Sequence, residues 1–335
     1  MPVDDFQDIK KLVRNYYADL DAAAPDAVAS VLREYVAPDY SWRGMHPFNE
    51  LEGAASVATT FWEPLLRSIR PIQRRPDVFM AGANDIKPFG GTWVCCMGHL
   101  LGLFDENWLG IPSTGKMVFF RFVEFHEVAE GQIVQTAHFF DIPSVMRQAG
   151  VNPFPPDTGQ HFLTPGPRTH DGLLHSVQDP DRSRKTMDLI NRMIDDLVGS
   201  GMESPQDELA RTWHEDMIWF GPTGIGAAYT RQRYQRQHQG PFRQGLGNIV
   251  FNGHVCRFSE GRYGGFFGWP NLTMKPTGGF MGVPATDRPV DMRVVDIYRR
   301  EGELLAENWI FIDLLHFFAQ QGLDMLARMR DICRT

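Results

Sequence analysis

Apolar residues near the start of the chain recur at the spacing of a helix. Within residues 6–23 they fall on one stripe, which predicts an amphipathic helix packed on a core: Ile9, Leu12, Val13, Tyr16 and Leu20. The same spacing returns over residues 26–36 and over residues 53–68, where Pro64 marks a kink or a turn. We therefore expect the chain to begin with three helical segments.

From about Arg74 the pattern becomes that of strands. Four apolar runs follow one another, most of them separated by glycine-rich or proline-rich breaks: residues 76–82, 91–102, 117–128 and 132–141. Short breaks of this kind join antiparallel strands as hairpins. Helices followed by antiparallel strands predict an α+β fold and not one in which strands and helices alternate.

The same order of elements then appears a second time. Residues 151–180 contain six prolines and three glycines, and we interpret them as a connector along the surface, part of which could cover a pocket. After the connector, a new helical stripe is formed by Met187, Ile190, Ile194 and Leu197. Strands are expected at residues 248–257, 262–269, 290–299 and 303–313.

Two long segments of the chain also match residue by residue. Segments 108–150 and 280–322 share eight positions at one interval of 172 residues (282 − 110): Gly110/Gly282, Pro112/Pro284, Thr114/Thr286, Arg121/Arg293, Glu124/Asp296, Asp141/Asp313, Gln148/Gln320 and Gly150/Gly322. Two further matches lie upstream: Trp42 with Trp219 in a D-x-x-W-x-G motif, and Gly53 with Gly226. Such a constant register indicates an internal duplication. It predicts two like domains, 1–150 and 181–335, joined by the connector 151–180.

Composition limits the classes of protein that fit. A chain of 335 residues, 43% of them hydrophobic, has room for about two globular domains. A net charge of −8 gives no broad positive surface, which argues against nucleic acid or an anionic membrane as a partner. No apolar run approaches the roughly 18–20 residues that cross a bilayer, and the acidic N-terminus does not look like a secretory signal. The four cysteines form no disulfide framework, so we expect a reducing, cytoplasmic setting.

Both copies end on the same series of features. A Gly-x-Pro-x-Thr turn leads into an apolar strand, a charged turn and a strand that ends in Asp before a Gln-x-Gly helix. Over residues 8–150 and 185–330 this order resembles the SnoaL-like polyketide cyclase branch of the nuclear-transport-factor-2-like superfamily. The resemblance implies two tandem cone-shaped α+β half-barrels. In each, a curved antiparallel sheet and its N-terminal helices enclose one apolar pocket.

The resemblance also bears on assembly and on activity. Single-domain members commonly pair through their sheets, so a fused pair is expected to pack as an intramolecular pseudo-dimer, with further homo-oligomerisation left open. The superfamily includes aldol cyclases, isomerases, dehydratases, epoxide hydrolases and proteins without catalysis. Its fold therefore does not fix the reaction.

The last strand of each copy carries the first candidate for chemistry. Alternate residues of a strand share a face, which groups Asp141 with Phe139, and Asp313 with Trp309 and Glu307. If this face is concave, each pocket holds a carboxyl group among aromatic rings, where burial would suit it to proton transfer. In the cyclases and epoxide hydrolases that the sequence resembles, an Asp near the end of this strand is the general acid and base. In the alternative interpretation, each Asp caps the helix that follows.

Two arginines lie in otherwise apolar strands. Arg121 and Arg293 need a partner, a ligand or water. In a pocket they would stabilise an enolate or hold a ligand carboxylate; paired with the neighbouring Asp they would be structural. Glu124 and Asp296, three residues further on, fall on the opposite strand face.

Histidines and aromatic residues complete the candidate site. His99 and His138 are the histidines expected in the first pocket, either as acid–base partners or as core residues, and Ile310 replaces His138 in the second copy. The residues expected to contact a ligand are Trp42, Trp219, Trp269, Glu307, Trp309 and Phe139, with core packing as the alternative for the tryptophans. No zinc spacing and no dinucleotide-binding glycine motif is present, so neither a metal nor a cofactor is expected.

Three functions fit these features. The first is a cofactor-free cyclase, isomerase or lyase that acts on a small carbonyl-containing or polyketide-like molecule, with Asp141 or Asp313 as the general acid and base. The second is a hydrolase or hydratase in which the same Asp activates water. The third is a protein that binds a small ligand without catalysis.

Overall fold

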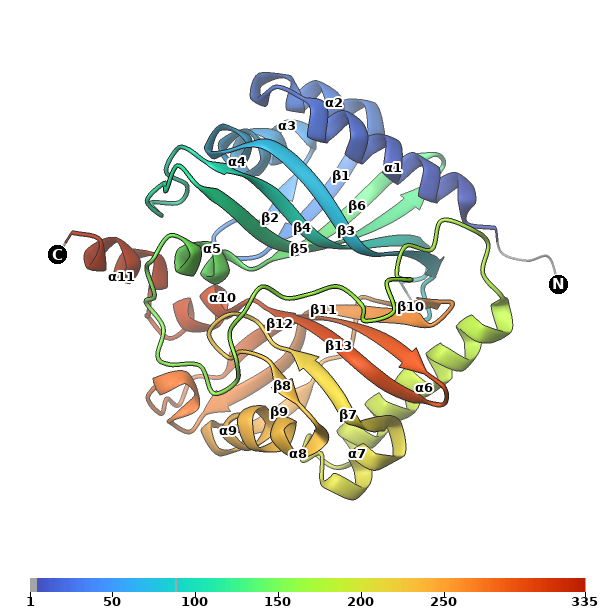
Figure 1. Ribbon diagram of the computed structural model, residues 1–335, viewed down its shortest axis with the longest axis vertical. Helices are drawn as coiled ribbons and strands as arrows, with labels where there is room; N and C mark the ends of the chain where they lie inside the picture. The colour runs from blue at the N-terminus through green and yellow to red at the C-terminus, as the bar shows by residue number, and fades with distance from the viewer. Residues whose placement is uncertain (1–4, 88, 335) are drawn as a thin grey trace.

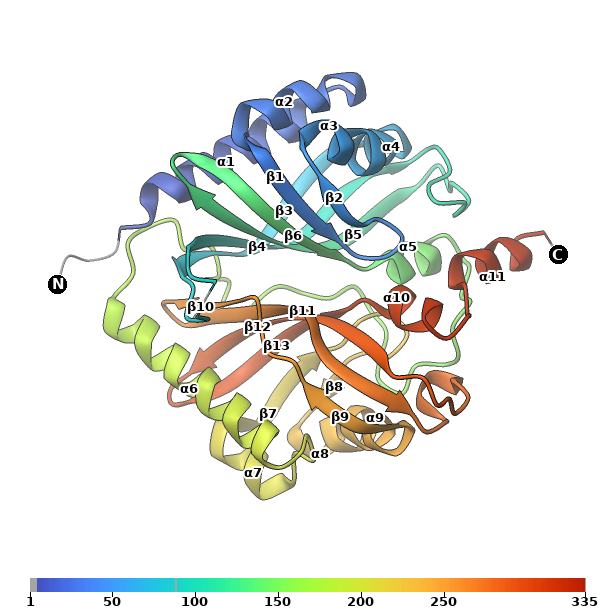
Figure 2. The same cartoon turned by 180° about the vertical axis from the view of Figure 1, so that it is seen from behind.

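The computed structural model describes residues 5–87 and 89–334, so the acidic N-terminal segment is described from Asp5 onward. The chain forms two similar halves stacked on each other, each with a curved sheet and an outer layer of helices (Figures 1 and 2). The helical segments of the first half are α1 (Gln7–Ala22), η1 (Pro25–Ala27), α2 (Val28–Tyr35), α3 (Ala54–Val57), the π turn η2 (Ala58–Trp62), α4 (Glu63–Ser68) and α5 (Ile142–Gln148). Its strands are β1 (Val36–Gly44), β2 (Asn49–Glu52), β3 (Ile69–Ala83), β4 (Thr92–Phe104), β5 (Met117–Ala129) and β6 (Gln132–Phe140). They lie in the order β2-β1-β6-β5-β4-β3.

The second half repeats this architecture. Its helical segments are α6 (Pro180–Gly199), α7 (Gln206–Thr212), α8 (Arg231–Tyr234), the π turn η3 (Gln235–Gln239), α9 (Gly240–Gly245), η4 (Phe280–Gly282), α10 (Leu314–Ala319) and α11 (Met325–Ile332). Its strands are β7 (Trp213–Phe220), β8 (Ala228–Tyr229), β9 (Leu246–Phe251), β10 (Cys256–Glu260), β11 (Tyr263–Pro276), β12 (Val290–Glu301) and β13 (Leu304–Ile312). Their order is β10-β11-β12-β13-β7-β8, with β9 also paired to β11. The predicted α+β fold with two curved sheets is thus confirmed.

Local sequence explains most of these elements, and two details differ from the prediction. The stripe of α1 is buried through Val13, Tyr16 and Leu20, as its spacing predicts. Pro64 does not kink a helix: it lies in the first turn of α4, where its missing N–H costs no hydrogen bond, directly after the π turn η2. The strand expected at 248–257 is divided into β9 and β10, both of which pair with β11.

The structure corrects one match between the halves. Gly53 was paired with Gly226, but the registers of β1–β2 and β7–β8 make Gly53 equivalent to Thr230, 177 residues apart (230 − 53). Both residues have a positive φ, +76° and +69°, and each precedes the first turn of a short helix. The π turns η2 and η3 follow at the same interval (235 − 58).

The halves pack sheet against sheet, with the helices α1–α4 and α6–α9 on the outside (Figures 1 and 2). Aromatic rings form the contact: the ring of Phe267 lies 5.2 Å from Phe125 and 6.2 Å from Phe139, and Phe139 meets Trp269 at 5.6 Å. Lys10 adds a buried ion pair to Glu260. This is an intramolecular pseudo-dimer, and it buries the second face of each sheet.

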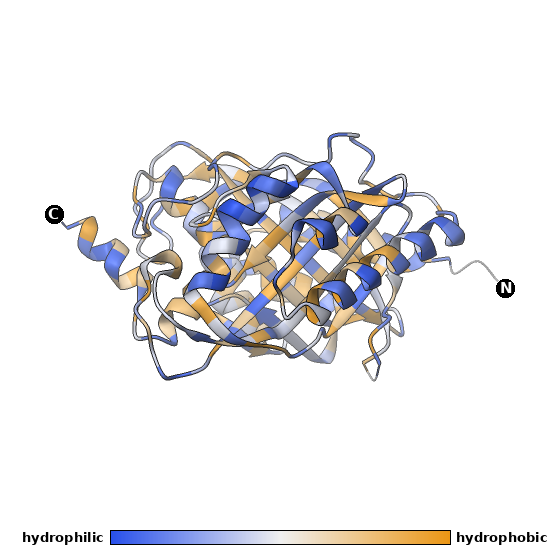
Figure 3. Ribbon diagram, turned by 90° about the horizontal axis from the view of Figure 1, so that it is seen from below, coloured by the Kyte–Doolittle hydropathy of each residue, from blue (hydrophilic) through white to orange (hydrophobic). Residues whose placement is uncertain are grey.

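The connector between the halves runs along the second sheet. Its Pro165 carbonyl accepts a hydrogen bond from the Trp309 indole at 2.9 Å, and the Arg168 amide donates to the Glu307 carboxylate at 3.1 Å. Hydrophobic residues are concentrated on the strands, and the outer helices alternate between hydrophobic and hydrophilic residues (Figure 3). Of the helices in the described part of the chain, none is long and apolar enough to cross a membrane.

Candidate functional site

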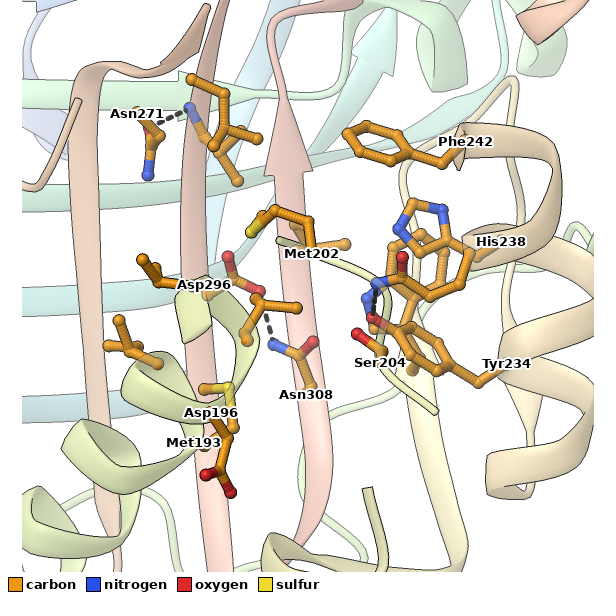
Figure 4. A pocket seen from close by; sticks show the side chains of 18 of the residues that line it. Met193, Asp196, Met202, Ser204, Tyr234, His238, Phe242, Asn271, Asp296 and Asn308 are labelled. Atoms are coloured by element: carbon orange, nitrogen blue, oxygen red, sulfur yellow. Dashed lines mark hydrogen bonds between the residues drawn. The ribbon is translucent and has the colours of Figure 1, made fainter. Parts of the chain in front are cut away.

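The second half contains a pocket between its sheet and its helices (Figure 4). Its volume, including the mouth, is about 970 Å³, within the range of small-molecule sites. Strands β7, β11, β12 and β13 form the floor, and α6, α7 and the segment from α8 to α9 form the walls. Most of the lining is apolar, with a few polar groups directed inward.

Asp296 on β12 is the acidic group of this floor. Its side chain is buried, and Asn308 on the neighbouring strand β13 donates a hydrogen bond to it at 2.9 Å. Removal from water disfavours the ionised carboxyl and raises the pKa of Asp296 to about 7, although hydrogen bonds from Asn308 and Tyr298 act in the opposite direction. A carboxyl with this pKa is present in both protonation states near neutral pH.

The wall opposite the strands carries a second polar group. His238 and Gln239 lie on the π turn η3, and Gln239 donates a hydrogen bond to the Tyr234 hydroxyl at 2.7 Å. The His238 ring is stacked on Trp219 with 4.0 Å between the ring centroids. Burial lowers the pKa of His238 to about 3, so its imidazole is neutral at physiological pH.

The pocket has no positive side chain among the described residues that line it. Its acidic groups are Asp296, Asp196 and Glu208, of which Asp196 pairs with Arg211 at 3.3 Å. A ligand carboxylate or phosphate would find no cation there and would be repelled by these groups. The electrostatics therefore favour an uncharged ligand.

In the first half, larger side chains occupy the equivalent space. Phe122 and Phe140 stand where the second half has Val294 and Ile312, at the interval of 172 residues. Phe61 and Trp62 of η2 stand where η3 has His238 and Gln239, at the interval of 177 residues. The Phe61 ring is stacked on Phe140 at 5.1 Å, and Trp62 is stacked on His138 at 5.6 Å. Aromatic packing thus fills the first cup, whereas smaller side chains leave the second one open.

A buried polar network remains inside this filled cup. Glu124, the counterpart of Asp296, forms an ion pair with Arg74 at 2.9 Å, and the Nδ1 atom of His138 lies 3.5 Å from the other Glu124 oxygen. Desolvation lowers the pKa of His138 well below its ordinary value. Arg74 also pairs with Asp21 at 3.1 Å, so Glu124 is held by a structural ion-pair network.

Asp141 and Asp313 lie on the other face of their strands, between the halves. Asp141 caps α5 by accepting a hydrogen bond from the Ser144 amide at 3.0 Å, and its second oxygen accepts from the Thr223 amide and hydroxyl at 3.0 and 2.9 Å. Asp313 caps α10 and accepts a hydrogen bond from the His46 amide at 2.9 Å. The expectation that this face is concave is corrected: it is the face through which each sheet contacts the other half, and only a small crevice separates the two carboxyl groups there.

The two arginines share this location. Arg121 donates a hydrogen bond to the Phe220 carbonyl at 3.3 Å and lies over the Phe311 ring of the other half at 4.1 Å. Arg293 pairs with Asp313 at 3.3 Å and lies over the Trp269 ring at 3.9 Å. The two side chains bind groups at the contact between the halves and do not reach the pocket.

The remaining candidates are distributed among different regions. His99 lies opposite Arg121 in the sheet, with its ring 3.4 Å from Asp77. Phe139 and Trp269 form the contact between the halves, and Glu307 and Trp309 contact the connector. Trp219 lines the pocket, while Trp42 and His138 lie within the filled first cup.

The sequence contained a signal for the group that was missed. Asp296 was recognised as the match of Glu124 and was assigned to the strand face opposite Arg293. The assignment of opposite faces was correct, but the face chosen as concave was the one that carries Arg293. With the other choice, Asp296, Tyr298 and Asn308 would have been predicted to share the pocket.

Known families match both halves of the chain. A family of SnoaL-like domains matches residues 13–136, and the family of SnoaL-like polyketide cyclases matches residues 271–321. The fold and its pocket define a small-molecule-binding protein of the nuclear-transport-factor-2-like class. The chain belongs to the SnoaL-like polyketide cyclase family of that superfamily, with one such domain in each half.

Solved structures of the same class resemble parts of the chain. A protein described as a SnoaL-like polyketide cyclase from Jannaschia sp. CCS1 is 22% identical, over 47% of this chain and 97% of its own, with a TM-score of 0.34. One described as a polyketide cyclase from Xanthomonas campestris pv. campestris is 22% identical, over 43% and 97%, with a TM-score of 0.35. A nuclear-transport-factor-2-like protein from Burkholderia thailandensis E264 is 21% identical, over 42% and 95%, with a TM-score of 0.30. A comparison with curated proteins found no match.

Proposed function

We propose that the pocket of the second half binds a small, uncharged organic molecule and that Asp296 exchanges a proton with it. The observation that carries this proposal is a buried carboxyl group with a pKa of about 7 on the floor of an apolar pocket. Membership of the SnoaL-like family supports a ligand-binding role for the pocket. Asp296 takes the role that the sequence suggested for Asp141 and Asp313.

The arrangement suits proton transfer beside a carbonyl group. As a base, ionised Asp296 would remove a proton from carbon, and the resulting acid would return it at another position. Asn308 fixes the orientation of the carboxyl group, and Tyr298 interacts with it from the same strand. The reactions that fit are aldol cyclisation, isomerisation and elimination, without a cofactor. Activation of water by the same carboxyl is the alternative.

The proposal is tested with 1-tetralone, a neutral ketone whose protons beside the carbonyl exchange slowly. We expect the protein to accelerate their exchange in deuterated water, followed by NMR, and Asp296→Asn to reduce the acceleration by about 10²- to 10⁴-fold. Asp313→Asn is the control, because its side chain lies between the halves. If Asp313→Asn abolishes exchange and Asp296→Asn does not, the assignment to Asp296 is wrong. If both variants bind the ketone and neither changes its exchange, the second half is a binding domain without this chemistry.

A further inference from the structure

The two π turns are equivalent elements with different chemistry. Each follows a short helix and interrupts it at the same place, 177 residues apart. In η2 the two residues directed into the cup are Phe61 and Trp62, which pack among aromatic rings. In η3 the equivalent residues are His238 and Gln239, which line the open pocket. Single π turns inside helices are frequent at functional sites.

Both polar side chains of η3 have an unused hydrogen-bonding atom. The Nδ1 atom of His238 and the Oε1 atom of Gln239 are buried and have no partner in the described part of the chain. Each side chain belongs to a residue that is only 7% exposed, so bulk water reaches neither freely. A buried polar atom without a partner costs free energy. The first half shows that apolar residues fit at the same two positions of this fold.

The neighbouring contacts fix the orientation of the two side chains. The amide nitrogen of Gln239 is used by the Tyr234 hydroxyl, which leaves its carbonyl oxygen as the free acceptor. Stacking on Trp219 holds the His238 ring, and Phe242 flanks it at 5.7 Å. Figure 4 shows His238 and Tyr234 on the wall that faces the strands with Asp296 and Asn308.

We infer that His238 and Gln239 form a subsite that recognises a hydroxyl group of the ligand. The hydroxyl would donate to the Gln239 oxygen and accept from the N–H of a neutral His238 imidazole. This assigns the ligand two ends: a hydroxyl at the π turn and the proton-exchanging carbon at Asp296. The inference rests on the proposed binding role of the pocket, and adds which residues determine its specificity.

The test compares 2-naphthol with 2-methoxynaphthalene, which has the same ring system but no hydroxyl proton. We expect the unaltered protein to bind 2-naphthol about tenfold more tightly, measured by ligand-observed NMR titration. His238→Phe and Gln239→Met should each remove this preference while leaving the affinity for 2-methoxynaphthalene nearly unchanged. Arg236→Met, on the exposed side of the same turn, is the matched control and should keep the preference.

A double variant tests the role of the turn in keeping the pocket open. His238→Phe with Gln239→Trp recreates the side chains of η2, and we expect it to weaken the binding of both probes. Equal binding of the two probes by the unaltered protein, or a preference that survives both single variants, would overturn the hydroxyl subsite while leaving the pocket as a binding site. Failure of both probes to bind would overturn the proposed binding function together with the subsite.

Discussion

Asp296 and Arg293 show how three positions along one strand separate two environments. Arg293 contacts Asp313 and Trp269 between the halves, whereas Asp296 lies in the pocket on the other side of the sheet. The arginine is stabilised by a carboxylate, and the carboxyl of Asp296 has only neutral hydrogen-bond donors. A buried acid without a cation binds its proton more tightly. Its titration should therefore be measurable as a change in stability.

We expect the stability of the protein to fall with pH through Asp296. The pKa of this carboxyl is about 7 in the folded chain and about 3.9 in an unfolded one, so the folded state binds the proton more tightly. The stabilisation is complete below the unfolded pKa and is lost as pH rises through 7. Relative to Asp296→Asn, which cannot titrate, the free energy of unfolding should decrease by about 3 kcal/mol between pH 5 and pH 8.

This pH dependence is measured by urea unfolding of both proteins. Asp216→Asn, at an exposed carboxyl group, is the control for the loss of one charge and should follow the unaltered protein. Parallel stability curves for the unaltered protein and Asp296→Asn would contradict the assigned pKa.

At the scale of elements, the last strand of each half leads into a helix through a capping aspartate. Asp141 and Asp313 cap α5 and α10, which was the alternative interpretation of these residues. The two roles of an aspartate at this position have the same sequence pattern, because both need a short acidic side chain at the end of a strand. In this chain each cap also bonds a backbone amide of the other half, Thr223 or His46.

Removal of the Asp141 carboxyl should affect more than a helix end. We expect Asp141→Ala to lower the free energy of unfolding by about 2–4 kcal/mol, because it removes a cap and leaves the buried Thr223 amide without a partner. Asp324→Ala is the matched control: Asp324 caps the exposed start of α11, so its loss should cost about 1 kcal/mol. Denaturant midpoints provide the measurement, and equal losses in the two variants would show that the contact with Thr223 contributes nothing.

At the scale of the molecule, the contact between the sheets makes the two halves one unit. Phe267 lies at the centre of this contact, with Phe125, Phe139 and Trp93 around it. A shared aromatic core couples the folding of the halves, so we expect one calorimetric unfolding transition and a single compact particle in solution scattering. Phe267→Ala should lower the free energy of unfolding by about 3–5 kcal/mol. Two well-separated transitions in the unaltered protein, or scattering from two mobile lobes, would contradict this coupling.

The sequence by itself determined the elements and their duplication. Helical stripes such as that of α1, the strands β4 to β6 and β12 to β13, and the register between the halves depend on local periodicity, which the chain displays directly. The opposite orientation of Arg293 and Asp296 also follows from strand alternation. Family resemblance then gave the α+β half-barrel fold.

Only the tertiary structure decided which face of each sheet is concave and which cup is open. Both faces are buried, one under helices and the other against the second half, so strands such as β5 and β12 are apolar on both sides. Alternation therefore does not distinguish the pocket from the contact between the halves. The open cup depends on volumes summed over distant residues, with Phe61 and Phe140 filling one half and His238 and Ile312 leaving space in the other.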